Sequence, residues 1–183
     1  VPALTVERRL THRERAAQAV ASFKEKLASS PVYKSVEVTS FGKDHYDSLA
    51  PAGSADMVLT FRNVHNWYMA DFAGDAFKAF YTALKPGGVL GVVEHRLPED
   101  RPDAAMKSSG YMKRSVIVAL AEAAGFKLAG ESQVNANPKD TADWPNGVWS
   151  LPPNFREGDK DRAKYAAIGE SDRMTLKFVK PAS

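Results

Sequence analysis

Four hydrogen-bonding side chains follow one apolar run, where a buried strand would lead into a helix. The run is ADMVLTF, residues 55–61, and the side chains are those of Arg62, Asn63, His65 and Asn66. Histidine suits proton transfer because its usual pKa is close to neutral, and amide and guanidinium groups can bind a polar molecule beside it. The stretch therefore predicts a small-molecule site with His65 as the first candidate for a catalytic base.

A second polar pair stands near the end of the next apolar run. Glu94 and His95 belong to GVLGVVEHRL, residues 88–97. In open parallel sheets, ligands bind beyond the carboxyl ends of the strands, so the two groups are expected to line one pocket. His95 is the second candidate for the base. Two side chains fall short of the three or four ligands of a typical metal site, so no metal is expected.

The segments that must position these residues alternate between helical and extended patterns. Apolar residues at helical spacing predict helices over 6–27, 67–84 (one helix or two) and 112–125. Alternating or continuous apolar runs predict strands over 35–41, 55–61, 88–97, 126–135 and 173–180. This order, without an internal repeat, is typical of a layered α/β domain.

Composition limits the function classes. With 183 residues, 44% hydrophobic and 26% charged, the chain fits a single globular domain over 1–183. A net charge of +3, with basic and acidic residues interspersed, gives no reason to expect a nucleic-acid partner. The absence of cysteine excludes disulfides and zinc–thiolate sites. No apolar run approaches the roughly 20 residues of a membrane span, so no membrane is expected. The expected compartment is cytoplasmic, and an exported form stays open because the chain begins with Val1.

A long insert separates the last two predicted strands. Residues 138–171 carry Trp144, Trp149, Phe155 and Tyr165 among several prolines. Connections longer than about 12–15 residues are usually functional or disordered. The insert is either a surface excursion that packs its aromatic side chains on the domain or a lid over a pocket.

Several stretches resemble the class I S-adenosylmethionine-dependent methyltransferases, most closely a bacterial group of predicted methyltransferases without an established substrate. The stretches are ADMVLTFRNVHNW, FYTALKPGGVLGVVEH, GYMKRSVIVALAEAAGFKLAGES and GESDRMTLKFVKP. The resemblance implies a Rossmann-like, doubly wound and mostly parallel sheet with an antiparallel last strand. It also implies S-adenosyl-L-methionine as cofactor and a small-molecule methyl acceptor.

The resemblance also implies residue roles. The cofactor would be held by Phe41 and Gly42 at the adenine, by Asp44 as acceptor for the adenine amine, and by Arg62 and Asn63. The substrate side would be lined by Asn66, Glu94 and Trp149.

Structural alternatives stay open for most of these residues. Arg62 and Asn63 could cap the following helix, His65 could be a packed histidine, Glu94 and His95 could form a local polar pair, and Asp44 could begin a turn.

The chain departs from the family at its beginning. It contains no glycine-rich E/D-x-G-x-G loop, and the family's first β-α-β unit has no counterpart, as in an N-terminally truncated protein.

The family's strand order would leave the 35–41 strand roughly 14 Å from the 55–61 strand, a gap that cannot stay empty. A separate piece or a second copy would fill it, or the sheet would rearrange; self-association through the exposed sheet edge is expected. Cofactor binding by this chain alone should be weak. The alternative function is a non-catalytic ligand-binding or assembly module.

Overall fold

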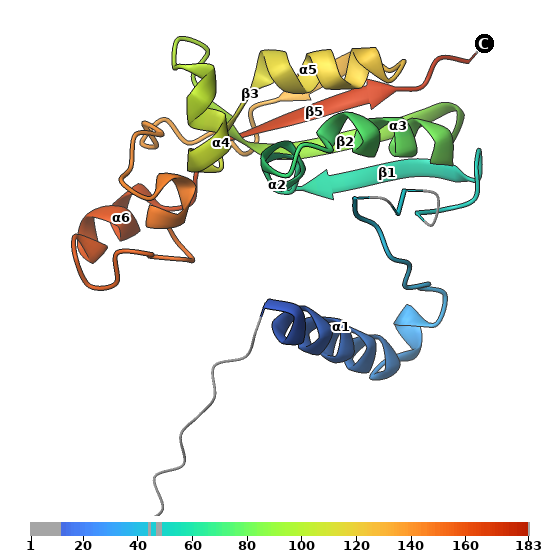
Figure 1. Ribbon diagram of the computed structural model, residues 1–183, viewed down its shortest axis with the longest axis horizontal. Coiled ribbons are helices and arrows are strands. Elements are labelled where there is room, and N and C mark those ends of the chain that lie inside the picture. The colour runs from blue at the N-terminus through green and yellow to red at the C-terminus, as the bar shows by residue number, and fades with distance from the viewer. Residues whose placement is uncertain (1–11, 44, 47–48, 183) are drawn as a thin grey trace, which may run out of the picture. The chain divides into compact units, whose positions relative to one another are not determined.

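The computed structural model describes residues 12–43, 45, 46 and 49–182 (Figure 1), and the chain divides into two compact units, 1–39 and 40–183. In the first unit, α1 (His12–Ala28) precedes a 3-10 turn, η1 (Pro31–Tyr33), at which the Ser30 side chain accepts a hydrogen bond from the Val32 amide. The predicted helix is confirmed from residue 12 onward, and its first residues lie outside the described part. A single domain over 1–183 remains a prediction.

The second unit is built on one sheet with the strand order β1-β2-β5-β4. Its strands are β1 (Ala55–Phe61), β2 (Leu84–Leu97), β3 (Met112–Lys113, paired with the end of β2), β4 (Lys127–Ser132) and β5 (Arg173–Val179). β1 is parallel to β2, whereas β5 is antiparallel to both β2 and β4. The first four strands therefore share one direction and the last opposes them, which confirms the predicted fold class.

Helices lie against one face of this sheet, on which Figure 1 shows α2, α3 and α5 together. The helices of the unit are α2 (Val64–Met69), α3 (Ala73–Ala83), α4 (Met106–Ser109), α5 (Arg114–Ala123) and α6 (Arg162–Ile168), with short 3-10 turns η2 (Asp103–Ala105) and η3 (Gly147–Ser150). The pattern over 67–84 is thus a pair of helices, and the predicted helix over 112–125 starts as the short strand β3.

The core lies between these helices and the sheet. Leu90 and Val92 of β2 and Phe178 of β5 are fully buried against Phe77 of α3 and Ile117 of α5. Each such side chain contributes roughly 1.5–3 kcal/mol by leaving water. Because strand residues alternate between faces, this packing fixes which residues of β1 point away from the helices.

The opposite face of β1 carries apolar side chains that remain exposed. Met57, Leu59 and Phe61 have exposed fractions of 56%, 55% and 56%. Leu59 lies over Gly91 of β2, where an added Cβ would come within 2.6 Å of the leucine Cδ2. Among the described residues, β1 pairs with β2 alone, so it is an edge strand with an apolar outer face.

The predicted strand over 35–41 is wrong. These residues are in no strand, and the alternating Val36 and Val38 are exposed. A strand needs a partner's backbone groups, and none of the described strands pairs with this segment, although β1 is an edge strand. The rearranged sheet in which 35–41 pairs with β1 is therefore not formed either.

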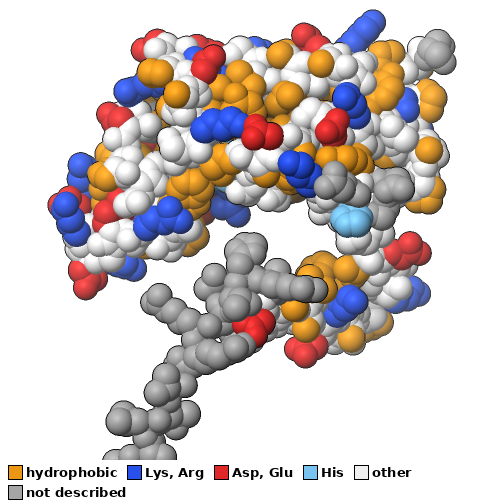
Figure 2. Space-filling model, in the orientation of Figure 1, with side chains coloured by type: hydrophobic (Ala, Val, Ile, Leu, Met, Phe, Trp, Pro, Cys, Tyr) orange, Lys and Arg blue, Asp and Glu red, His pale blue; other side chains and the backbone are white. Residues whose placement is uncertain are grey.

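Charges of both signs are interspersed on the visible face of the larger unit, as Figure 2 shows. None of the described helices is both long and apolar enough to cross a bilayer.

Candidate functional site

The exit of β1 turns sharply and places His65 inside the protein. The Arg62 amide donates to the Val93 carbonyl (2.8 Å), while the Arg62 backbone takes φ = 55°, which is unusual for a residue with a side chain. Helix α2 then begins directly, with Asn63 at the N-cap. The Asn63 side chain makes no cap hydrogen bond; instead its Oδ1 accepts from Nδ2 of Asn66 (3.3 Å). The capping alternative is thus not realised by this side chain.

A fully buried carboxylate holds His65. Glu94 Oε1 lies 2.9 Å from Nδ1 of His65, and Glu94 Oε2 accepts from the His65 backbone amide (3.1 Å). Glu94 Oε1 also accepts from the backbone amide of His95 (2.8 Å). Since a carboxylate only accepts hydrogen bonds, Nδ1 of His65 carries a proton, and in the neutral ring Nε2 is the nitrogen with the free lone pair.

The ring of His95 is held by a residue just before β5 and not by the side chain of Glu94, which in His95 accepts a hydrogen bond only from the backbone amide. Its Nδ1 is 2.6 Å from Oγ of the buried Ser171. Burial lowers the pKa of His95 from its usual 6.5 to about 4; the Glu94 charge opposes this, and Arg62 and Arg173 add to it. His95 is therefore neutral at physiological pH.

Three potential metal ligands come together in this network. One ligand atom from each of His65, Glu94 and His95 lies within 4.8 Å of the others. Both Glu94 oxygens already accept hydrogen bonds, and the charges of Arg62 and Arg173 act against a cation at this place. The geometry therefore favours a hydrogen-bonded histidine–carboxylate pair over a metal centre.

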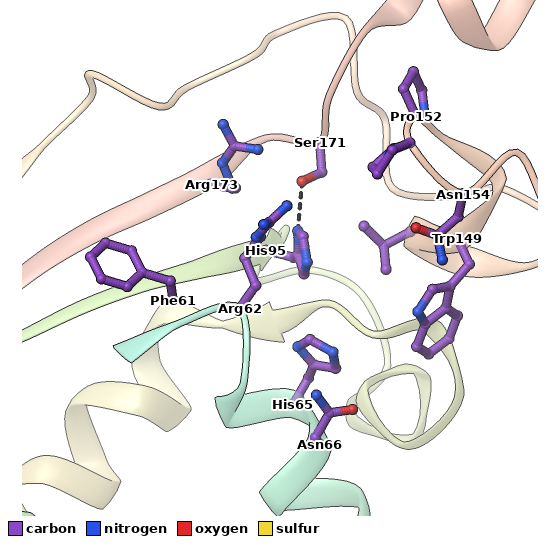
Figure 3. Close-up of a pocket in the computed structure, with 12 residues that line it drawn as sticks. Phe61, Arg62, His65, Asn66, His95, Trp149, Pro152, Asn154, Ser171 and Arg173 are labelled. Atoms are coloured by element: carbon purple, nitrogen blue, oxygen red, sulfur yellow. Dashed lines mark hydrogen bonds between the residues drawn. The ribbon is translucent and has the colours of Figure 1, made fainter. Parts of the chain in front are cut away.

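A cavity of about 340 Å³ opens above the two histidines, within the range of small-molecule sites. Figure 3 shows His65, His95 and Arg62 side by side at this cavity, with Trp149 and Asn154 on the opposite wall. The lining residues come from the end of β1 and α2 (Phe61, Arg62, His65, Asn66), from β2 and the start of β5 (His95, Ser171, Arg173), and from the insert (Val148, Trp149, Pro152, Pro153, Asn154).

The insert over 138–171 lies between β4 and β5 and packs tightly against α4. An added Cβ at Gly147 would be 2.1 Å from the Ser109 carbonyl oxygen, and one at Gly110 would be 2.7 Å from Val148. Trp149 reaches the site, with its ring centroid 6.2 Å from that of His65. In this structure the insert forms one wall of the cavity.

One carboxylate anchors the beginning of the insert. Asp140 accepts hydrogen bonds from the hydroxyl of Tyr111 (2.9 Å), from Nε1 of Trp144 (2.7 Å), and from the backbone amides of Ala142 (3.0 Å) and Asp172 (2.8 Å). Burial and the Asp140 charge raise the pKa of Tyr111, so its hydroxyl stays a donor. These bonds join the insert to the segment before β3 and to the start of β5.

The structure brings only part of the predicted site residues together. Arg62, His65, Asn66, His95 and Trp149 line the cavity. Glu94 lies behind the histidines, where it is buried completely and acts on His65.

The residues expected at the adenine lie elsewhere. Phe41 packs into an aromatic cluster, 5.6 Å from both Trp67 and Phe80 by ring centroids. Gly42 forms a turn with His45, whose amide donates to its carbonyl (3.0 Å). Asp44 lies outside the described residues. Neither Phe41, Gly42 nor Asn63 lines the cavity.

Among the cavity residues that were not predicted from the sequence, Ser171 and Arg173 are the polar pair beside His95. Arg173 begins β5 and is the register partner of His95, and Ser171 lies two residues before it. A signal for them exists: an antiparallel last strand begins at the edge where its parallel neighbour ends. The residues at and just before the start of the predicted strand 173–180 could therefore have been named as candidate site residues.

Comparisons with known proteins place the fold. No family model matches the chain, and no curated protein matches it. Among solved structures, the 4+2 cyclase SpnF is similar with a TM-score of 0.59 and 19% identity over 93% of this chain and 64% of that one. A putative sarcosine dimethylglycine methyltransferase from Galdieria sulphuraria is similar with a TM-score of 0.57 and 12% identity, over 87% of this chain and 64% of that one. The mitomycin 7-O-methyltransferase MmcR is similar with a TM-score of 0.54 and 15% identity, over 89% of this chain and 39% of that one.

The chain thus spans less than two thirds of the length of each of these proteins. At these identities the similarity establishes the fold alone. On that evidence, the chain has the α/β fold of the S-adenosylmethionine-dependent methyltransferases and their related cyclases.

Proposed function

We propose that this chain is the acceptor-binding part of an S-adenosylmethionine-dependent methyltransferase that acts on a small molecule, with His65 as general base. The observation that carries the proposal is the contact between His65 Nδ1 and the buried Glu94 Oε1 (2.9 Å) beside the 340 Å³ cavity. This contact leaves Nε2 of His65 to accept a proton from a molecule in the cavity.

The roles of the two histidines differ. When His65 takes the acceptor's proton at Nε2, the Glu94 carboxylate stabilises the positive ring that forms, as in other histidine–carboxylate pairs. His95 is neutral because its pKa is lowered to about 4, so it serves as a hydrogen-bonding group for the acceptor. The insert wall with Trp149 shields one side of the cavity from water.

The residues present fit the acceptor better than the cofactor. When bound, S-adenosylmethionine supplies an electrophilic methyl group. Of the described residues expected to hold it, Arg62 alone lines the cavity, and the sequence contains no glycine-rich loop for its ribose and carboxylate. Cofactor binding by residues 1–183 alone should accordingly be weak.

The proposal is tested by methyl transfer from tritiated S-adenosylmethionine, at millimolar concentration, to a panel of small phenols and hydroxy acids. His65→Ala should lower turnover by more than about tenfold. His45→Ala is the matched control, because His45 belongs to the turn with Gly42 and does not line the cavity. Unchanged turnover in His65→Ala would remove this residue from the catalytic role.

A readout without any substrate tests the same contact. Side-chain ¹⁵N NMR at pH 8 should show His65 protonated at Nδ1 and unprotonated at Nε2, because Nδ1 donates to Glu94. The opposite tautomer would contradict the assignment of the base.

The second candidate is a non-catalytic ligand-binding or assembly module on the same scaffold. It is favoured by the exposed apolar row of Met57, Leu59 and Phe61 on the edge strand β1, because such edges invite pairing. Calorimetric titration with S-adenosylhomocysteine separates the candidates. Absence of binding at any concentration, together with absence of methyl transfer, would favour the module.

A further inference from the structure

A second cavity adjoins the one above the histidines. It measures about 320 Å³ and shares Phe61, Arg62 and Arg173 with the first cavity. The two histidines line the first cavity and not the second. The two guanidinium groups therefore stand where the cavities meet, so a molecule placed over His65 can also reach them.

The charges around this junction do not balance. Arg173 forms an ion pair with Glu170, which also lines the second cavity. No acid among the described residues forms an ion pair with Arg62. Glu94 lines neither cavity, and its oxygens are occupied by His65 and by the amide of His95. The charge of Glu170 also acts on Arg62 across this cavity, so two guanidinium groups face one carboxylate and one positive charge is in excess at the junction.

The backbone conformation of Arg62 is a second, independent indication that its side chain has a functional role. Its φ of 55° costs free energy that glycine would avoid, and such outliers gather at functional sites. Figure 3 shows the Arg62 side chain extending from the end of β1 toward His95, over the cavity. The neighbouring wall is apolar, with Trp149, Pro152 and Pro153.

We infer that the acceptor is a hydroxy acid, with its carboxylate bound by Arg62 and Arg173 and its hydroxyl placed at His65. This inference rests on the proposed function and adds its substrate class. A guanidinium binds a carboxylate through two parallel hydrogen bonds, which gives both affinity and orientation. An aromatic ring between the two groups fits the apolar wall formed by Trp149 and the two prolines.

The test compares two ligands of similar shape, of which one carries a carboxylate and the other a neutral carboxamide. 3-Hydroxybenzoate and 3-hydroxybenzamide are titrated calorimetrically into the full 183-residue chain at low ionic strength, without cofactor. The acid should bind at least about tenfold more tightly than the amide, as expected for a charge-assisted pair. Arg62→Gln should abolish this preference, whereas Arg62→Lys should keep part of it, because it retains the charge and loses the paired hydrogen bonds.

Arg114→Gln is the matched control, since Arg114 pairs with Glu131 on the surface and lines neither cavity. It should keep the full preference for the acid. Equal binding of acid and amide, failure of both to bind, or a preference that survives Arg62→Gln would overturn the inference.

The outcome is distinguishable from that of the proposed function because no methyl transfer is measured. A preference for the acid in a chain that transfers no methyl group would support the anion subsite and contradict the enzyme. Methyl transfer to neutral acceptors alone would support the enzyme and overturn the anion subsite.

Discussion

Replacing Glu94 by glutamine should lower the free energy of unfolding by about 2–3 kcal/mol, although the two side chains have nearly the same shape. The carboxylate accepts three hydrogen bonds: Oε1 from His65 Nδ1 (2.9 Å) and the His95 amide (2.8 Å), and Oε2 from the His65 amide (3.1 Å). All three donors are fixed, because two are backbone groups and the third belongs to a buried ring.

An amide cannot satisfy this set in either orientation. With its oxygen in the Oε1 position, the glutamine NH₂ faces the donating amide of His65. With its oxygen in the Oε2 position, the NH₂ faces the amide of His95 and can pair with Nδ1 of His65 only after that ring changes its tautomer. Each orientation thus loses one buried, charge-assisted hydrogen bond and places two donors together, which costs about 2–3 kcal/mol.

Urea denaturation followed by tryptophan fluorescence measures this change. Glu131→Gln is the matched control, because it removes one exposed ion pair with Arg114 and should cost no more than about 1 kcal/mol. Glu94→Gln should also impair methyl transfer, since it releases His65 from its tautomer. A loss of stability below about 1 kcal/mol, or equal to that of the control, would refute the conclusion that the three hydrogen bonds accepted by Glu94 stabilise the fold.

Three further residues, and the edge strand, give additional tests. The pKa of His95 is lower in the folded chain, so the unfolded chain takes up a proton first, and the free energy of unfolding should fall by about 3 kcal/mol as pH drops from 6.5 to 4. Urea denaturation across this range should show a weaker pH dependence of stability for His95→Gln, whereas His45→Gln should keep the wild-type dependence. Asp140→Ala should destabilise the chain by about 4 kcal/mol in the same assay, because four donors lose one buried acceptor; a loss under about 1 kcal/mol would mean that water replaces it. Arg62→Gly should raise the free energy of unfolding by about 1 kcal/mol by relieving the positive φ, and a decrease would show that the side chain stabilises the fold. Leu59→Lys should weaken self-association in sedimentation velocity, and a wild-type chain that stays monomeric at high concentration would contradict the expected use of the exposed edge.

The sequence determined the elements whose patterns are satisfied locally or by burial. The continuous apolar run over 55–61 and the run over 88–97 became neighbouring parallel strands, because each buries one row of side chains under helices. Polar groups at the ends of these strands met in one cavity for the same topological reason, so His65, His95, Arg62 and Asn66 could be named beforehand. Trp149, which lines the cavity wall, was also named from the sequence.

Tertiary structure alone decided the remaining features, since they depend on partners that lie far apart in the chain. The alternating residues over 35–41 looked like a strand, yet a strand forms only by pairing, and none of the described strands pairs with this segment although β1 is an edge strand. The protonated nitrogen of His65 is set by Glu94, 29 positions away, and the neutral state of His95 by burial near Ser171 and two arginines. Spacing along the chain can place a histidine at an edge; only the packed neighbours determine which of its nitrogens can accept a proton.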